Sequence, residues 1–214
     1  MSEPASQQQD STVSSARNEA WAAVNTPLEA DQLVAFCSDI ERLIRINPML
    51  EFRRFEKTGE HRYRLQGRNI SQVPAFEFDE EIEVQPLADG CRIQYSTGLK
   101  TSTRIKISAA EQPGELVRST LHVTDYYAGH DEKALQKRLN EVDKSLIPWL
   151  KDVQKYLLQW RKWSKFRLYR WYMRRVWLPM KPSGRRITYM LLWISLVEVA
   201  LIALGAAIYI VEYT

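Results

Sequence analysis

The chain has 214 residues, of which 45% are apolar and 26% are charged, and its formal net charge is +4. This length fits one or two domains, the apolar content excludes an intrinsically disordered chain, and two cysteines are too few for a disulfide framework. The charge is unevenly spread, because residues 1–150, 151–186 and 187–214 carry net charges of −5, +11 and −2.

The N-terminal part of the sequence predicts a tail, a strand and two short helices. Residues 1–17 are rich in Ser and Gln and have no apolar core, so they are expected to be disordered and are no signal peptide. The apolar segment 21–24 predicts a first strand. Two capping-box patterns, at residues 26–29 and 38–41, predict helices that follow them, the second of which ends at Asn47-Pro48.

Between residues 50 and 127 apolar and polar residues alternate with a period of two, which is typical of strands with one buried face. Turn signals such as Asp89-Gly90 and Thr97-Gly98 divide this region into about six strands. With the first strand, the sequence predicts an antiparallel sheet of about seven strands.

After residue 131 the apolar period changes to 3.6 and continues to residue 157, which predicts one long amphipathic helix. Pro148 lies inside this pattern and is expected to kink or interrupt the helix, so that continuity from residue 132 to about 178 is open.

Residues 159–186 form a basic and aromatic segment, which we call the neck. Lysine and arginine favour an anionic leaflet, and tryptophan and tyrosine favour the headgroup level of a bilayer. The neck is therefore expected to lie on a membrane, although nucleic acid and a protein partner are alternatives. The expected membrane-contacting residues are Trp160, Trp163, Arg167, Arg170, Trp171, Arg174, Arg175 and Trp177.

Residues 187–211 contain one charged side chain, Glu198. At about 1.5 Å per residue, a helix of this length covers roughly 37 Å and can cross a bilayer. The sequence therefore predicts a single C-terminal transmembrane helix. Glu198 is expected to be protonated or paired with another helix, which the small residues of Ala203–Ala207 would allow to approach.

The basic residues before the span place residues 1–186 in the cytoplasm under the positive-inside rule, at the inner membrane if the source is bacterial. In this reducing compartment Cys37 and Cys91 are expected to be buried free thiols. No His or Cys spacing indicates a metal site, and no cofactor is expected.

The predicted order of one strand, two short helices, six antiparallel strands and a long helix resembles the helix-grip fold of the START-like superfamily. This superfamily includes polyketide cyclases, the major birch pollen allergen and coenzyme-Q-binding START proteins. The resemblance covers residues 18–158, and the segment from Asp39 to Pro48 is similar to one that these proteins carry after the second helix. It implies an α+β domain whose sheet wraps the long helix around a cavity for a lipid, sterol, quinone or polyketide.

The inward positions of the strands and of the long helix supply the candidate cavity lining. Glu80 and Asp125 share this inward phase and must be paired, near the cavity mouth, or neutral; Glu80 either anchors a ligand or is turned outward by a bulge. The candidate residues are Phe52, Tyr63, Leu65, Phe76, Phe78, Glu80, Ile82, Ile93, Tyr95, Ile105, Ile107, Leu121, Val123, Asp125, Leu139, Val142 and Leu146.

The sequence thus predicts a membrane-anchored protein that binds or transfers a hydrophobic small molecule. The alternative is a non-enzymatic accessory subunit of a membrane complex, with Glu198 and the neck as contact surfaces and the cavity filled. A cyclase-like enzyme is not expected, because no inward His–carboxylate pair or Arg cluster is visible.

Overall fold

The computed structural model describes residues 19–98, 100–110, 114, 117–127 and 144–213. Within these residues one antiparallel sheet contains β1 (Glu19–Thr26), β2 (Leu50–Lys57), β3 (Arg62–Asn69), β4 (Phe76–Leu87), β5 (Gly90–Tyr95), β6 (Lys100–Ala109) and β7 (Ser119–Tyr127). The strand order is β1-β7-β6-β5-β4-β3-β2, a meander in which the first strand joins the last. The predicted sheet of about seven strands is confirmed.

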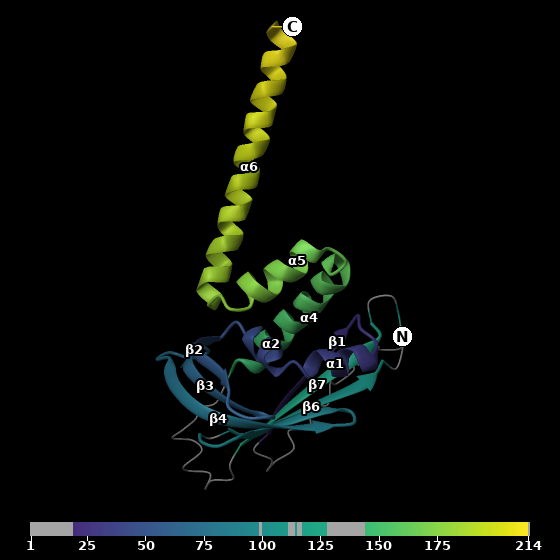
Figure 1. Ribbon diagram of the computed structural model, residues 1–214, viewed down its shortest axis with the longest axis vertical. Coiled ribbons are helices and arrows are strands. Elements are labelled where there is room, and N and C mark those ends of the chain that lie inside the picture. The colour runs from purple at the N-terminus through teal and green to yellow at the C-terminus, as the bar shows by residue number, and fades with distance from the viewer. Residues whose placement is uncertain (1–18, 99, 111–113, 115–116, 128–143, 214) are drawn as a thin grey trace, which may run out of the picture.

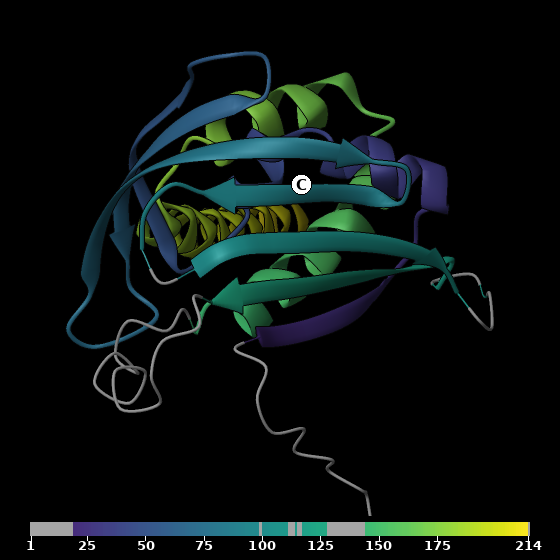
Figure 2. The ribbon, with the colours of Figure 1, turned by 90° about the horizontal axis from the view of Figure 1, so that it is seen from below.

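The helices cover the concave face of the sheet (Figures 1 and 2). α1 (Ala30–Cys37) lies against β5, β6 and β7, α2 (Ile40–Arg45) lies against β2, and α4 (Leu146–Trp163) lies against β1. Between the helices and the sheet is the buried core, which includes Leu33, Leu43, Ile93, Val153 and Leu157. The alternating strand pattern and the 3.6-residue helix pattern thus meet in one apolar layer.

The first predicted capping box is wrong, and the second is right only about the position of its helix. Thr26 is the fully buried last residue of β1, and its hydroxyl pairs with the Ser119 hydroxyl at 2.8 Å. α1 therefore begins at Ala30 without a side-chain cap. At α2 the carboxylate of Asp39 accepts the backbone N–H of Arg42 at 3.2 Å, so the capping residue is Asp39.

Pro148 lies in the first turn of α4, which begins at Leu146 after a turn at residues 144–145, so it is not in the interior of this helix. It is the third residue of the helix, where a backbone N–H has no intrahelical acceptor and its absence costs nothing. The helix instead ends at Trp163, and α5 (Arg167–Tyr172) follows with a π-helical turn, η2 (Met173–Trp177). The start of the predicted long helix and the expected disordered tail lie outside the described residues.

The last helix, α6 (Pro182–Tyr213), projects away from the domain on the side of the helices, opposite the sheet (Figure 1). Residues 182–211 have a mean hydropathy of 2.4 over their most apolar stretch, and none of that stretch is buried. In the described part of the chain this is the one helix long and apolar enough to cross a membrane.

Cys37 and Cys91 are both buried and unpaired, as expected. Burial raises the pKa of the Cys37 thiol above its usual range and that of Cys91 to about 11. Because only the thiolate reacts with alkylating agents, both thiols should be inert in the folded protein.

We expect iodoacetamide at pH 8 to label the folded protein roughly a hundredfold more slowly than the urea-unfolded chain, since burial suppresses the thiolate and blocks access. Mass spectrometry of timed aliquots measures both rates, with free cysteine added as an internal standard. Equal labelling rates in the two states would show that the thiols are accessible.

Candidate functional site

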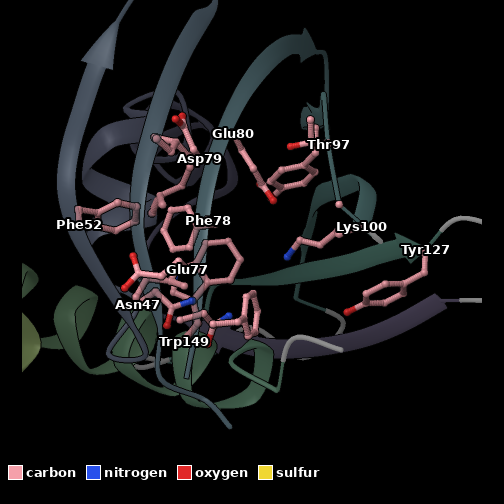
Figure 3. A pocket seen from close by; sticks show the side chains of 17 residues that line it. Asn47, Phe52, Glu77, Phe78, Asp79, Glu80, Thr97, Lys100, Tyr127 and Trp149 are labelled. Atoms are coloured by element: carbon pink, nitrogen blue, oxygen red, sulfur yellow. The ribbon is translucent and has the colours of Figure 1, made fainter. Parts of the chain in front are cut away.

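A cavity of about 460 Å³ lies between the concave face of the sheet and the first turn of α4 (Figure 3). One part of its wall is apolar and comes from α2, β2, β3, β4 and α4, and another part is polar and comes from β4, β5 and the ends of β6 and β7. The lining residues are Ile44, Asn47, Leu50, Phe52, Leu65, Asn69, Phe76, Glu77, Phe78, Asp79, Glu80, Tyr95, Thr97, Gly98, Lys100, Tyr127 and Trp149.

The apolar wall is built from aromatic rings in fixed positions. Phe52 meets Phe78 edge to face with 5.9 Å between the ring centroids, and Phe55 meets Phe52 in the same way at 5.4 Å. The Trp149 indole N–H donates to the backbone carbonyl of Leu43 at 2.9 Å, which holds that ring where α4 begins. The wall is therefore fixed by packing and by a buried hydrogen bond.

The curvature of this wall depends on a bulge in β2 opposite Gly67. The pairing of β2 with β3 shifts by one residue between Phe52 and Arg54. A Cβ at position 67 would lie 2.3 Å from the Glu51 carbonyl oxygen and 2.8 Å from the Phe78 ring. A glycine is thus required where the bulged strand and the ring of Phe78 come close.

A chain of buried polar groups supports the other end of the cavity. The Thr103 hydroxyl donates to Asp125 Oδ1 at 2.5 Å, and Lys100 Nζ lies 3.0 Å from Asp125 Oδ2. Asp125 and Thr103 are 1% and 0% exposed. The predicted inward carboxylate at position 125 is therefore paired, and it lies behind Lys100 rather than in the cavity wall.

Tyr95 extends this chain of hydrogen bonds into the cavity. Its hydroxyl lies 3.1 Å from Thr103 Oγ1. Because the Thr103 proton is used on Asp125, Tyr95 is the donor of this bond, which leaves its oxygen as an acceptor toward the cavity. Burial raises the pKa of Tyr95 to about 12, so the hydroxyl stays protonated at neutral pH.

Lys100 reaches the cavity because of a second bulge. The pairing of β6 with β7 shifts between Lys100 and Ser102, so Lys100 does not follow the outward phase of Arg104 and Lys106. Its ammonium group lies 5.2 Å from the centroid of the Tyr95 ring and is directed into the cavity (Figure 3). An uninterrupted period-two pattern would instead place Lys100 on the outward face of the sheet, with Arg104 and Lys106.

Glu80 lines the cavity from the middle of β4, near Lys100 and Thr97 in Figure 3. The register of β3 with β4 is continuous, with Leu65 opposite Glu80. These two strands therefore contain no bulge that would turn Glu80 outward, which was one of the two alternatives for this residue. Glu80 Oε1 would lie 3.1 Å from a Cβ at Gly98, whose φ of +92° also favours glycine. A side chain at position 98 would thus narrow the space that Glu80 uses.

Six of the candidate cavity residues line the cavity: Phe52, Leu65, Phe76, Phe78, Glu80 and Tyr95. Tyr63 lies beside Phe55 at 5.9 Å between ring centroids, outside the cavity lining. Seven others fill the core: Ile82, Ile93, Ile105, Ile107, Leu121, Val123 and Leu146. Leu139 and Val142 lie outside the described residues.

Sequence reasoning missed the polar lining that comes from turns and strand ends. Asn47 donates its side-chain amide to the Ser145 hydroxyl at 2.8 Å and is almost fully buried. Asn47 precedes Pro48 in the sequence, and Thr97-Gly98 is a turn signal, so the sequence predicts that these residues lie in connections between elements. Only the curvature of the sheet brings these connections to the cavity.

The neck divides into residues that face the domain and residues that face outward. Trp160 stacks on Tyr156 at 5.9 Å, and Trp177 lies 5.7 Å from the same ring. These two tryptophans, which the sequence places at the membrane, are partly buried against the domain core, and their contact with a membrane stays a prediction. The exposed members of the expected set are Trp163, Arg167, Arg170, Trp171, Arg174 and Arg175.

Arg42 of α2 joins this aromatic cluster from the domain side. Its Nε donates to the Tyr156 hydroxyl at 3.0 Å, and its guanidinium lies 4.1 Å from the centroid of the Trp160 ring. Arg42 is only 8% exposed, so the cation is stabilised largely by ring faces. The neck is thereby attached to the domain through α4.

Comparisons with known proteins show similarity of structure only. No protein-family model matches the sequence, and no curated protein sequence matches it. The solved structure of KanY protein matches with a TM-score of 0.50 and 10% identity, covering 66% of this chain and 98% of that one.

Two further solved structures match the same region. A START superfamily protein from Mycobacterium smegmatis has 15% identity and a TM-score of 0.46, and covers 66% of this chain and 97% of its own. A STAR-related lipid transfer protein fragment from Xanthomonas axonopodis has 11% identity and a TM-score of 0.41, and covers 65% and 85%. The order of the elements and the wrapped sheet confirm the START-like helix-grip fold.

The buried pair predicts a measurable cost for Asp125→Ala. Removing the carboxylate takes away the anion that the Thr103 hydroxyl and the Lys100 ammonium contact in the buried interior, which we expect to destabilise the protein by about 3 kcal/mol. Urea unfolding of the full-length protein in detergent, followed by circular dichroism, measures this loss. The control Glu56→Ala removes an exposed carboxylate paired with Arg54 and should leave the unfolding midpoint unchanged; equal midpoints for the two variants would contradict the assigned role.

Proposed function

We propose that this protein binds a hydrophobic small molecule, of the lipid, sterol or quinone class, and holds or transfers it at the surface of a membrane to which α6 anchors it. The observation that carries this proposal is the 460 Å³ cavity, which combines an aromatic wall with a charged end. Its volume lies within the range of about 300–1,000 Å³ that is typical of small-molecule sites.

The two ends of the cavity suit an elongated ligand with one polar end. Phe52, Phe78 and Trp149 offer apolar surface, whose burial supplies most of the affinity. At the other end Lys100 brings ammonium N–H groups, and Glu80 brings carboxylate oxygens. A ligand oxygen near Lys100 would accept a hydrogen bond from the ammonium, and a ligand hydroxyl near Glu80 would donate one to the carboxylate. The polar groups of the ligand would then be buried with hydrogen-bond partners.

Binding fits these side chains better than catalysis does. Asp125, the buried carboxylate, is held by Thr103 and Lys100, and Tyr95 donates its proton to Thr103. These groups are oriented by one another, which suits a fixed receptor for a polar end group.

The membrane part of the proposal depends on α6 and on the exposed neck. α6 is long, apolar and exposed, and the neck before it is strongly basic. A basic segment next to a span favours the cytoplasmic side. Trp163 and Trp171, each about half exposed, would lie at the headgroup level beside the start of the span.

An accessory role in a membrane complex is the second candidate, because Glu198 lies on the exposed surface of α6. A carboxylate within a bilayer favours a polar partner on another helix. This role predicts that a membrane protein co-purifies with the wild type and is lost in Glu198→Leu. That result, together with a wild-type cavity that holds no ligand, would favour the accessory role over the binding proposal.

The test of binding is the small-molecule content of the purified full-length protein, measured by mass spectrometry of organic extracts. Leu65→Trp places a larger side chain in the cavity wall, so we expect at least about a tenfold loss of bound ligand, equivalent to about 1.4 kcal/mol. The matched control Leu87→Trp lies on an exposed strand end outside the lining and should retain the ligand. Wild-type protein that carries no lipid, sterol or quinone and takes up none when supplied would refute the proposal.

The test of anchoring and orientation uses the full chain with reporters at its two ends. We expect a C-terminal alkaline phosphatase to be active, an N-terminal green fluorescent protein to be fluorescent, and the protein to stay in the membrane pellet after alkaline carbonate, because α6 would cross the bilayer with the basic neck inside. Release by carbonate would refute anchoring, and the reverse reporter pattern would refute the cytoplasmic orientation.

A further inference from the structure

A second cavity, of about 260 Å³, lies where the domain meets the start of α6. It is bounded by α4, by the end of η2 and by the first two turns of α6, the elements that come together near the base of α6 in Figure 1. We call it the junction cavity. It shares no lining residue with the larger cavity, so it is a separate site.

Three cations and one carboxylate line the junction cavity: Lys155, Arg185, Arg186 and Asp152. In the described part of the chain none of these four side chains forms an ion pair within 4.0 Å, although each of the three cations lies close enough to Asp152 to act on its carboxyl electrostatically. Burial raises the pKa of the Asp152 carboxyl, and the three cations oppose that effect. With all four groups charged, the cavity has a net charge of +2.

Arg185 is held in place by backbone carbonyls. Its Nε donates to the Trp177 carbonyl at 3.0 Å, and its Nη2 donates to the carbonyls of Arg45 and Leu178 at 2.8 and 2.9 Å. Its guanidinium also lies 4.2 Å from the centroid of the Trp177 ring. These bonds use Nε and Nη2, so Nη1 is the nitrogen that remains to meet an anion.

The cavity has an apolar side that continues onto α6. Trp177 and Tyr189 line it, and Tyr189 is 64% exposed near the beginning of the apolar part of α6. From Ile187 onward the next charged residue is Glu198. A molecule seated here would meet cations at one end and an exposed apolar helix surface at the other.

From this arrangement we propose that the junction cavity binds the phosphate headgroup of one anionic phospholipid, whose acyl chains lie along α6. Arg185 supplies a preoriented guanidinium for the phosphodiester, and the exposed Lys155 and Arg186 add positive charge beside it. The inference rests on the proposed insertion of α6 into a membrane, and it is independent of what the larger cavity binds.

A built site differs from the diffuse attraction of the neck to an anionic surface. Lys165 and Arg167 of the neck are exposed and line neither the junction cavity nor the larger cavity, so their contribution is to the general surface potential. The cations of the junction cavity instead border one partly open cavity, which Tyr156, Trp177 and Tyr189 also line. A built site predicts saturable binding of one lipid, whereas surface attraction predicts binding that grows with the charge of the surface.

The experiment titrates full-length protein in neutral detergent with dioctanoyl phosphatidylglycerol, and native mass spectrometry counts the bound lipids. We expect one saturable lipid in the wild type. The double variant Lys155→Gln and Arg186→Gln should weaken binding about 30-fold, at roughly 1 kcal/mol for each cation. Asp152→Asn, which removes the carboxylate, should tighten binding several-fold.

The matched control Lys165→Gln and Arg167→Gln removes the same two charges from the neck and should change the affinity less than twofold. Equal weakening in the two double variants, or no weakening in either, would overturn the proposal. Competition by inorganic phosphate at equal concentration would also overturn it, because the site would then take free phosphate rather than a lipid. Leu65→Trp alters only the larger cavity, so this variant should lose the ligand of that cavity and still bind one lipid at the junction cavity. Failures of the two proposals are therefore distinguishable.

Discussion

A strongly curved sheet that wraps one helix leaves more concave apolar surface than that helix can cover. Here the bulge in β2 opposite Gly67 bends the sheet around the start of α4, and α1 and α2 cover much of the remaining concave face. The space that is left is the 460 Å³ cavity. Its position and its aromatic wall are consequences of this geometric mismatch.

The same curvature brings buried polar groups next to the cavity, and each of them needs a hydrogen-bond partner. Asp125 and Thr103 are almost completely buried, and their cost is met by the hydrogen bonds that connect Tyr95, Thr103, Asp125 and Lys100. Because every member of this chain is oriented by a neighbour, the polar end has a fixed arrangement. A ligand would meet a preorganised surface there, with little rotamer entropy to lose.

Arginine side chains attach the proposed membrane part to the domain. Arg42 fixes the neck through Tyr156 and Trp160, and Arg185 fixes the start of α6 through carbonyls of α2 and of the turn after η2. Both side chains are partly or fully withdrawn from water, and aromatic faces contact both. The orientation of the cavity relative to α6 is therefore set by these buried contacts, and a membrane around α6 would meet the domain in one orientation.

The periodicities of the sequence determined the seven strands, the amphipathic α4 and the apolar α6, because each depends on local spacing of apolar residues. They also identified the inward face on which Phe52, Phe78 and Glu80 lie. The tertiary structure decided which inward residues line space and which fill the core, since that depends on curvature. It also directed Lys100 toward the cavity, because a bulge reverses the phase of β6 there. Trp160 and Trp177 pack toward the domain because Trp160 contacts Arg42 of α2 and Trp177 contacts Tyr156 of α4.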